Sequence, residues 1–132
     1  MNELNMSIFN QLSANSALIT ALGGTAIYHL QAPEAKPLPY VVYSWQGGGD
    51  VNDNPHDDNE SLRFVRAYAV KADQAGAIDA LIKPLLHKAA LTVTGYTIVF
   101  CFREDDFESV ETLPSGVNTY AMGGIYRIRL TK

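Results

Sequence analysis

The strongest constraint on this chain is a set of segments with the two-residue alternation or the β-branched and aromatic content of strands. Long segments of this kind cover residues 40–45, 62–71, 96–103 and 120–130, and a shorter one covers residues 27–30. In the last long segment, Tyr126, Ile128 and Leu130 share the face that is predicted to point inward. The intervening Arg127 and Arg129 are predicted to point outward.

Two regions have the apolar spacing of helices instead. Residues 3–13 form a predicted amphipathic helix, and after a break a short second helix over residues 17–22 is expected to end at Gly23. Residues 77–89 have the same spacing, with Pro84 predicted to kink that helix or end it early. Strand blocks separated by helical regions favour an α+β fold. We predict a mostly antiparallel sheet of about four to five strands, with the two helical regions packed on one face.

Length and composition indicate a single domain that spans residues 1–132. Hydrophobic residues make up 47% and charged residues 18%, which is a globular composition. Cys101 is the single cysteine, so an internal disulfide framework and a cysteine-based zinc site are excluded. No apolar run approaches the ~18 residues of a membrane span, and the first residues lack the features of a secretory signal. We therefore expect a soluble chain without a membrane partner, folded in a reducing cytoplasm.

Acidic residues are concentrated in residues 50–60 and 104–111, which hold ten of the 14 acids and no base. The first segment contains Asp50, Asp53, Asp57, Asp58 and Glu60, and the second contains Glu104, Asp105, Asp106, Glu108 and Glu111. Both are predicted to be long acidic loops. The formal net charge of −4 argues against a general nucleic-acid binder. Because the rest of the chain is basic, the charges invite a head-to-tail contact between copies, in which the loop of one copy meets the basic face of the next. The alternative is that each acidic loop only keeps a monomer in solution.

No arrangement of residues in the sequence predicts catalysis. The three histidines, His29, His56 and His87, lack the paired spacing of metal-binding motifs. The acidic stretch Asp50–Asp58 departs from a calcium-binding loop, because Pro55 stands where glycine is needed and Ser61 stands where the bidentate glutamate belongs. We therefore predict a protein that is not an enzyme, with no catalytic residue, no metal ligand and no cofactor. A small metal-dependent enzyme that uses Asp50–Asp58 is the alternative from a different class.

The order of these features along the chain resembles that of a known family. The stretch NSALITALGGTAIYHLQAP follows the first predicted helix, and LPYVVYSW precedes the first acidic segment. The strand LRFVRAYAVKAD, the helix AIDALIKPLL and the closing strand YRIRL complete the order. Together these pieces resemble the tail-completion or tail-terminator proteins of long-tailed bacteriophages, the small head–tail joining family.

The resemblance implies a structural virion protein at the head-proximal end of the tail, assembled in the host cytoplasm. Such a subunit would form a ring, expected to be a hexamer, that caps the completed tail tube, ends tube polymerisation and offers a surface for the head connector. Its partners would be further copies of itself, the tail tube protein and a head connector or stopper protein, with DNA passing through the channel without specific binding. A connector stopper or minor head protein is the neighbouring alternative, and a ligand-binding module is a further one.

Roles for particular residues follow from this interpretation. An acidic lumen repels DNA phosphates, so acidic residues are expected to face the channel or a partner. These residues are Asp50, Asp53, Asp57, Asp58, Glu60, Glu104, Asp105, Asp106 and Glu108. The arginines expected to contact neighbouring subunits or the tube are Arg63, Arg66, Arg127 and Arg129.

Overall fold

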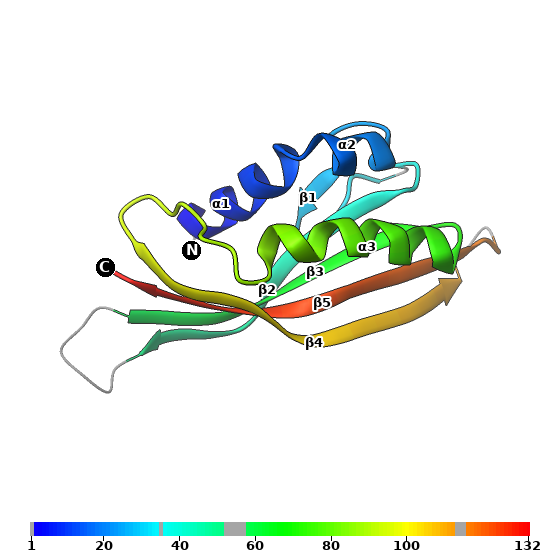
Figure 1. Ribbon diagram of the computed structural model, residues 1–132. Helices are drawn as coiled ribbons and strands as arrows, with labels where there is room; N and C mark the ends of the chain where they lie inside the picture. Colours follow the sequence, from blue (N-terminus) through cyan, green and yellow to red (C-terminus); the bar gives the residue numbers. More distant parts are fainter. Residues whose placement is uncertain (1, 35, 52–57, 113–115) are drawn as a thin grey trace.

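The computed structural model describes residues 2–34, 36–51, 58–112 and 116–132, with the backbone alone for Asp50 and Val51. Within these ranges, three helices and five strands follow one another along the chain (Figure 1). The helices are α1 (Asn2–Ser13), α2 (Ser16–Leu22) and α3 (Ala72–Leu86). The strands are β1 (Ile27–His29), β2 (Tyr40–Val51), β3 (Asp58–Ala69), β4 (Thr97–Thr112) and β5 (Asn118–Thr131).

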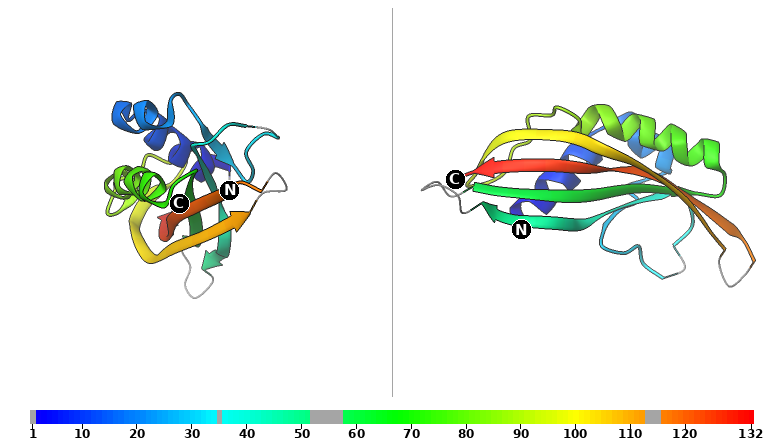
Figure 2. Two further views of the ribbon diagram at one scale, coloured as in Figure 1. Left: turned by 90° about the vertical axis from the view of Figure 1, so that its right-hand side faces the viewer. Right: turned by 90° about the horizontal axis from the view of Figure 1, so that it is seen from below.

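The strands form one sheet in the order β1-β2-β3-β5-β4. β1 lies parallel to β2, and the other neighbouring pairs are antiparallel. All three helices lie on one side of this sheet, and no helix of the described residues lies on the other (Figures 1 and 2). The predicted α+β class is confirmed, with a five-stranded, mostly antiparallel sheet and helices on one face.

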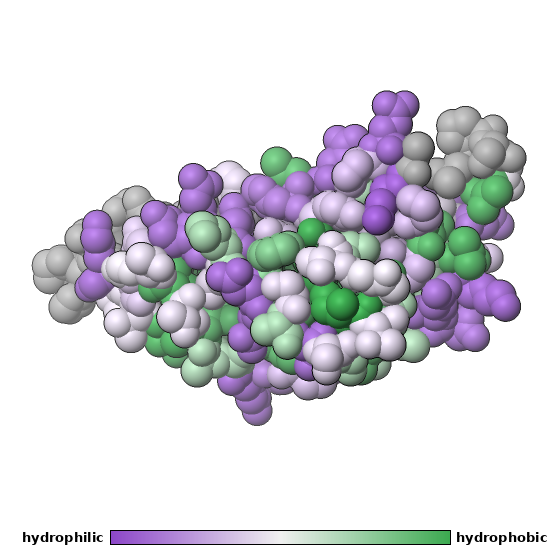
Figure 3. Space-filling model, turned by 90° about the horizontal axis from the view of Figure 1, so that it is seen from above, coloured by the Kyte–Doolittle hydropathy of each residue, from purple (hydrophilic) through white to green (hydrophobic). Residues whose placement is uncertain are grey.

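The outer surface of the helix layer is mixed in polarity. Viewed from the helix side, hydrophobic atoms form scattered patches between hydrophilic ones (Figure 3). The helices therefore bury their apolar stripes against the sheet and present a largely polar side to solvent, as surface helices do.

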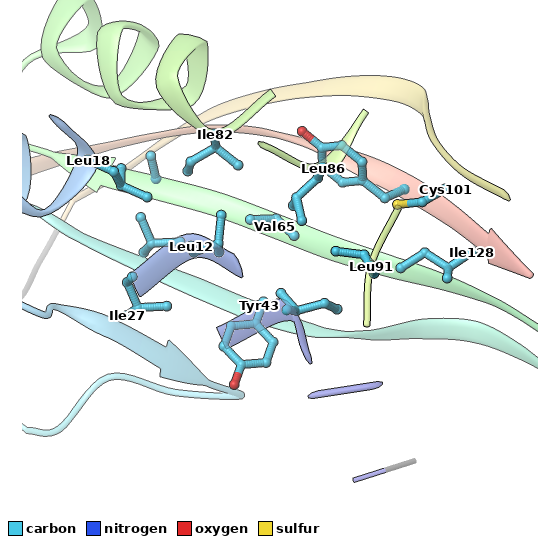
Figure 4. Close-up of a cluster of buried hydrophobic side chains, with 14 of the residues drawn as sticks. Leu12, Leu18, Ile27, Tyr43, Val65, Ile82, Leu86, Leu91, Cys101 and Ile128 are labelled. Carbon is cyan, nitrogen blue, oxygen red and sulfur yellow. The ribbon is translucent and has the colours of Figure 1, made fainter. Parts of the chain in front are cut away.

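The core lies between the helices and the face of the sheet that they cover (Figure 4). Alternation along β5 buries Tyr126, Ile128 and Leu130, each at most 1% exposed, as predicted. Leu12 of α1 and Ile82 of α3 reach the same cluster from the helix layer. Full burial of one such side chain is worth about 1.5–3 kcal/mol of transfer free energy, so burial of this kind holds the two layers together.

The helix boundaries follow from capping residues that the sequence marks. Asn15 precedes α2, and its side-chain oxygen accepts a hydrogen bond from the backbone N–H of Leu18 at 2.9 Å. Gly23 ends α2 in the left-handed conformation, at φ 73°, which confirms the predicted stop. α3 contains Pro84 and ends two residues later, at Leu86, short of the apolar pattern that continues to residue 89. The helix therefore does not stop at Pro84, although it ends before the apolar pattern does.

The second acidic segment is not a loop. Residues 104–111 lie inside β4, which pairs with β5 from Thr97 opposite Thr131 to Thr112 opposite Asn118. The loop prediction was wrong because the hydrogen bonds of a long neighbouring strand outweigh the low β-propensity of aspartate and glutamate. β4 is an edge strand, and there acidic side chains can remain in water while the backbone keeps its pairing on one side.

The first acidic segment also belongs in part to strands. The backbones of Asp50 and Val51 end β2 and pair with Asn59 and Asp58 at the start of β3. Glu60 likewise lies in β3. Asp53 and Asp57 lie outside the described residues, so the expectation of a long acidic loop concerns residues 52–57 alone.

Candidate assembly surface

The face of the sheet that points away from the helices is called the open face here. In β3, Leu62, Phe64 and Arg66 point toward the open face, while Arg63 and Val65 are buried on the helix side. The segment that connects β1 to β2 passes one end of the open face (Figure 2). There a small second cluster is formed by Val42, Tyr68 and Ala121, with Ala32, Leu38, Tyr40 and Phe107 packed against it.

A cluster of five charged residues lies on the other half of the open face. These residues, called the charged belt, are Asp58 and Glu60 of β3, Glu104 of β4, and Arg127 and Arg129 of β5. Arg127 contacts Glu104 at 2.8 Å and Glu60 at 3.3 Å. Arg129 contacts Asp58 at 2.7 Å and Glu60 at 4.0 Å. The belt forms because β5 lies between β3 and β4, so its outward arginines stand between two acidic strands.

The charged belt is a network of partly exposed groups. The hydrogen bond that Arg127 donates to Glu104, together with the nearby carboxylate charges, raises the pKa of Arg127, so the pairing favours the charged form. The side chains of Arg127, Glu60 and Glu104 are each about a third exposed, and ion pairs of that kind contribute about 0–1 kcal/mol to stability. The belt therefore fixes side-chain positions and surface charge more than it stabilises the fold.

Aromatic rings occupy the middle of the open face, and Arg66 lies over them. Phe64 and Phe107 meet edge to face with ring centroids 4.6 Å apart. The guanidinium of Arg66 lies 4.5 Å from the centroid of Phe64 and 5.5 Å from that of Tyr68, within the range of cation–π attraction. Arg66 is thus held on the open face by rings, separately from the charged belt.

Arg63, the fourth predicted arginine, lies on the helix side of the sheet. Its side chain donates to the side-chain oxygen of Asn5 in α1 at 2.8 Å, and the residue is 2% exposed. Burial lowers the pKa of Arg63. Within one subunit this arginine is a buried cation, unlike the other three.

The remaining predicted acids are dispersed. Asp105, Asp106 and Glu108 are exposed along β4. Asp106 binds Arg103 at 2.7 Å. Asp50 is placed by its backbone alone, and Asp53 and Asp57 lie outside the described residues. The fold thus brings Asp58, Glu60, Glu104, Arg127 and Arg129 together.

The sequence did not single out Arg103, a nearly buried side chain that holds β4 to α3 and β5. It donates two hydrogen bonds to the carboxylate of Asp79 in α3, at 2.9 and 2.8 Å, and one to the carbonyl of Gly123 at 2.6 Å. A further hydrogen bond, at 3.3 Å, reaches the hydroxyl of Tyr126. Burial raises the pKa of Tyr126 to about 12, and the Arg103 charge acts against that rise. The alternation of residues 96–103 places Arg103 on the face opposite Ile98, Phe100 and Phe102, so it gave no signal for this contact. A register shift between Ile98 and Phe100 turns Arg103 to the helix side, where its partner Asp79 lies 24 residues away in the sequence.

The described residues give little support to a metal site, a membrane-spanning helix or a reactive cysteine. Across the described ranges, no three metal-binding side chains form a group that could hold an ion. No helix in the described part of the chain has the length and hydropathy to cross a membrane. Cys101 is 2% exposed, and burial raises the pKa of its thiol to about 12. Such a thiol is unreactive, because the thiolate is the reactive form.

The fold is shared with solved structures. A chain of the virion of a native gene transfer agent particle superposes with a TM-score of 0.76 at 18% identity, covering 95% of this chain and 92% of that one. A second solved chain superposes with a TM-score of 0.64 at 10% identity, covering 99% of this chain and 94% of that one. No curated protein sequence matches significantly. These likenesses place the chain in a class of small α+β domains that includes a virion component.

The family model of tail completion protein gp17 matches residues 6–116. The chain belongs to this tail completion family. It is a structural protein of the phage tail, and its place is the virion.

Proposed function

We propose that this chain forms a ring of six copies that caps the completed tail tube, ends tube polymerisation and joins the tail to the head connector. Membership of the tail completion family over residues 6–116 carries this proposal. The fold shared with a chain of a gene transfer agent virion supports it. A subunit with this role acts by shape and contact, and it needs no catalytic group.

The open face has the properties needed for the wall of a channel that DNA passes. On the charged belt, three carboxylates surround two arginines, and each guanidinium has a carboxylate oxygen within 2.8 Å. An arginine held in this way is less available to phosphate, and the surplus negative charge repels DNA. We infer that Asp58, Glu60 and Glu104 face the channel. Asp50, Asp53, Asp57, Asp105, Asp106 and Glu108 remain candidates for the channel or a partner surface.

The proposed cap can be tested with the purified chain and the tail tube protein. We expect native mass spectrometry to find six copies bound at a tube end, and tube growth at that end to stop. Tubes that continue to grow in the presence of the chain would contradict the proposal. Binding to purified portal complexes, with none to tubes, would instead favour the connector-stopper role.

Neutralising two acids of the charged belt is expected to create DNA affinity. In the double variant Glu60→Gln and Glu104→Gln, Arg127 loses both carboxylate partners and becomes available to phosphate. The ring should then bind duplex DNA at least about tenfold more tightly at low salt, with a steeper salt dependence, because each copy frees one arginine. Fluorescence anisotropy with labelled DNA across a salt series measures both quantities.

The matched control removes the same charges elsewhere. Glu3 and Asp73 lie in the first turns of α1 and α3, on the helix side of the sheet. The double variant Glu3→Gln and Asp73→Asn should leave DNA binding close to that of the unmodified ring. Equal gains in the two double variants would mean that total charge, and not the charged belt, keeps DNA away.

A further inference from the structure

One edge of the sheet is covered only along its first part. β1 pairs with β2 at residues 41–43, and the last hydrogen bond on that side joins the N–H of Leu30 to the carbonyl of Tyr43 at 2.9 Å. From Ser44 to Gly49, no strand of the described residues pairs with the outer side of β2. This segment is called the free β2 edge.

The opposite edge of the sheet, formed by β4, is also covered only along its first part. The chain that leaves α3 covers the start of β4, where the N–H of Lys88 donates to the carbonyl of Cys101 at 2.6 Å and the N–H of Arg103 donates to the ring nitrogen of His87 at 3.0 Å. From Glu104 to Thr112, nothing in the described ranges pairs with the outer side of β4. This segment is called the free β4 edge.

Unpaired strand edges of this length are templates for another strand. Each free edge carries a large apolar side chain on the helix side of the sheet. Trp45 is 58% exposed on the free β2 edge, and Val110 is 56% exposed on the free β4 edge. Trp45 stands opposite the buried Arg63, and Val110 stands opposite Tyr120, whose strand neighbour is the buried Ala69. Both side chains would therefore lie on the same side of a continuous sheet.

The two free edges also carry complementary charges, a buried arginine beside the free β2 edge and a glutamate on the free β4 edge. A cavity of about 110 Å³ beside Trp45 is lined by Gly49, Asn59, Ser61 and Arg63. Two of these lining residues, each 2% exposed, hold a buried polar atom with no hydrogen-bond partner among the described residues: the side-chain nitrogen Nε of Arg63 and the hydroxyl of Ser61. Buried polar atoms normally find partners, so this cavity favours a hydrogen-bond acceptor with negative charge.

Glu108 supplies such an acceptor on the free β4 edge. It stands opposite Met122, whose sulfur lies against Gly76 of α3, so Glu108 points to the helix side as Trp45 does. Its carboxylate is exposed and makes no hydrogen bond or ion pair to another described residue. Asp105, by contrast, stands opposite Ile125 on the open face.

We propose that the free β4 edge of one copy pairs with the free β2 edge of the next copy, so that the sheet continues from subunit to subunit around the ring. This inference rests on the proposed ring. The pairing is antiparallel, because β2 and β4 run in opposite directions in one sheet and neighbouring copies keep the same orientation. Val110 then packs beside Trp45, and Glu108 reaches toward the cavity at Arg63 of the neighbour. The contact is head to tail, and such contacts form a ring when the rotation closes.

The offset between the two edges is compatible with closure. Bringing Val110 level with Trp45 displaces a neighbour along the strands by roughly 20 Å, against a width of roughly 24 Å for the five strands, at ~3.4 Å per residue and ~4.8 Å per strand. This ratio tilts the strands by about 40° from the ring axis, within the ~35–45° of closed β-barrels. The stagger therefore gives an inclined, closed sheet and requires no flat arrangement.

Two variants with defects on opposite edges test the pairing in the presence of tail tube protein. Trp45→Glu replaces the apolar side chain of the free β2 edge with a charged one, and Val110→Glu does the same on the free β4 edge. Each should weaken ring formation about thirtyfold or more, as loss of a central interface residue does. Mixed together, they should form a one-to-one dimer that grows no further, because one intact pair of edges remains. Native mass spectrometry distinguishes monomer, dimer and ring.

The controls separate this contact from the ring itself. Val70→Glu changes an equally exposed valine away from both edges and should assemble normally. Glu108→Gln should weaken the ring about tenfold or more, whereas Asp105→Asn on the open face should not. Rings of Trp45→Glu that equal those of the unmodified chain, or a mixture that stays monomeric, would overturn the edge pairing while leaving the cap proposal intact. If the unmodified chain neither assembles nor binds tubes, the cap proposal itself fails.

Discussion

Replacing Arg103 with methionine is expected to lower the free energy of unfolding by about 3–5 kcal/mol. The side chain of Arg103 is 6% exposed, and that of its partner Asp79 is 16% exposed. Methionine fills similar space, but it leaves the carboxylate of Asp79 and the carbonyl of Gly123 without their donor. Urea denaturation followed by circular dichroism measures the change.

Two further variants decide whether the buried pair is the cause. Asp106 is the exposed partner of Arg103, and the side chain of Asp106 is 85% exposed. Asp106→Asn should lower the free energy of unfolding by no more than about 1 kcal/mol. Arg103→Met combined with Asp79→Leu should recover much of the loss, since a buried ion pair replaced by apolar groups is often near neutral. A loss below about 1 kcal/mol for Arg103→Met alone would mean that water reaches Asp79.

The features predicted correctly are those that neighbouring residues determine. Tyr126, Ile128 and Leu130 reveal their face by the period of a strand, and Gly23 ends a helix because glycine adopts a positive φ. Capping at Asn15 likewise depends on an N–H three residues away. Such signals need no knowledge of the fold.

The features missed depend on pairing between distant segments. Residues 104–111 read as a loop by composition, but β5 pairs with them from residue 105 onward, after a register shift at Glu104. The ion pairs within the subunit were also missed: Arg127 and Arg129 find carboxylates on β3 and β4, up to 71 residues away, while their contacts with other chains stay a prediction. Only the strand order places these groups side by side, and composition does not encode that order.

Replacing Gly123 with alanine is the second large effect that we expect. Gly123 lies in β5 between Arg66 of β3 and Phe107 of β4. A Cβ at this position would collide with the carbonyl oxygen of Val65 and come within 2.8 Å of the Cα of Arg66. These are backbone atoms of a central strand, so neither can move without loss of the β3–β5 pairing. We expect a loss of about 3 kcal/mol in the free energy of unfolding, the upper end for overpacking.

Gly47→Ala is the matched control for this variant, since a Cβ at Gly47 meets nothing within 4 Å. It should change stability by no more than about 1 kcal/mol. Because Arg103 donates to the carbonyl of Gly123, the losses of Gly123→Ala and Arg103→Met should not add. Strand displacement at Gly123 already breaks the hydrogen bond that Arg103→Met removes, so the double variant should lose less than the sum. Additive losses in urea denaturation would show that β5 keeps its place when Gly123 carries a side chain.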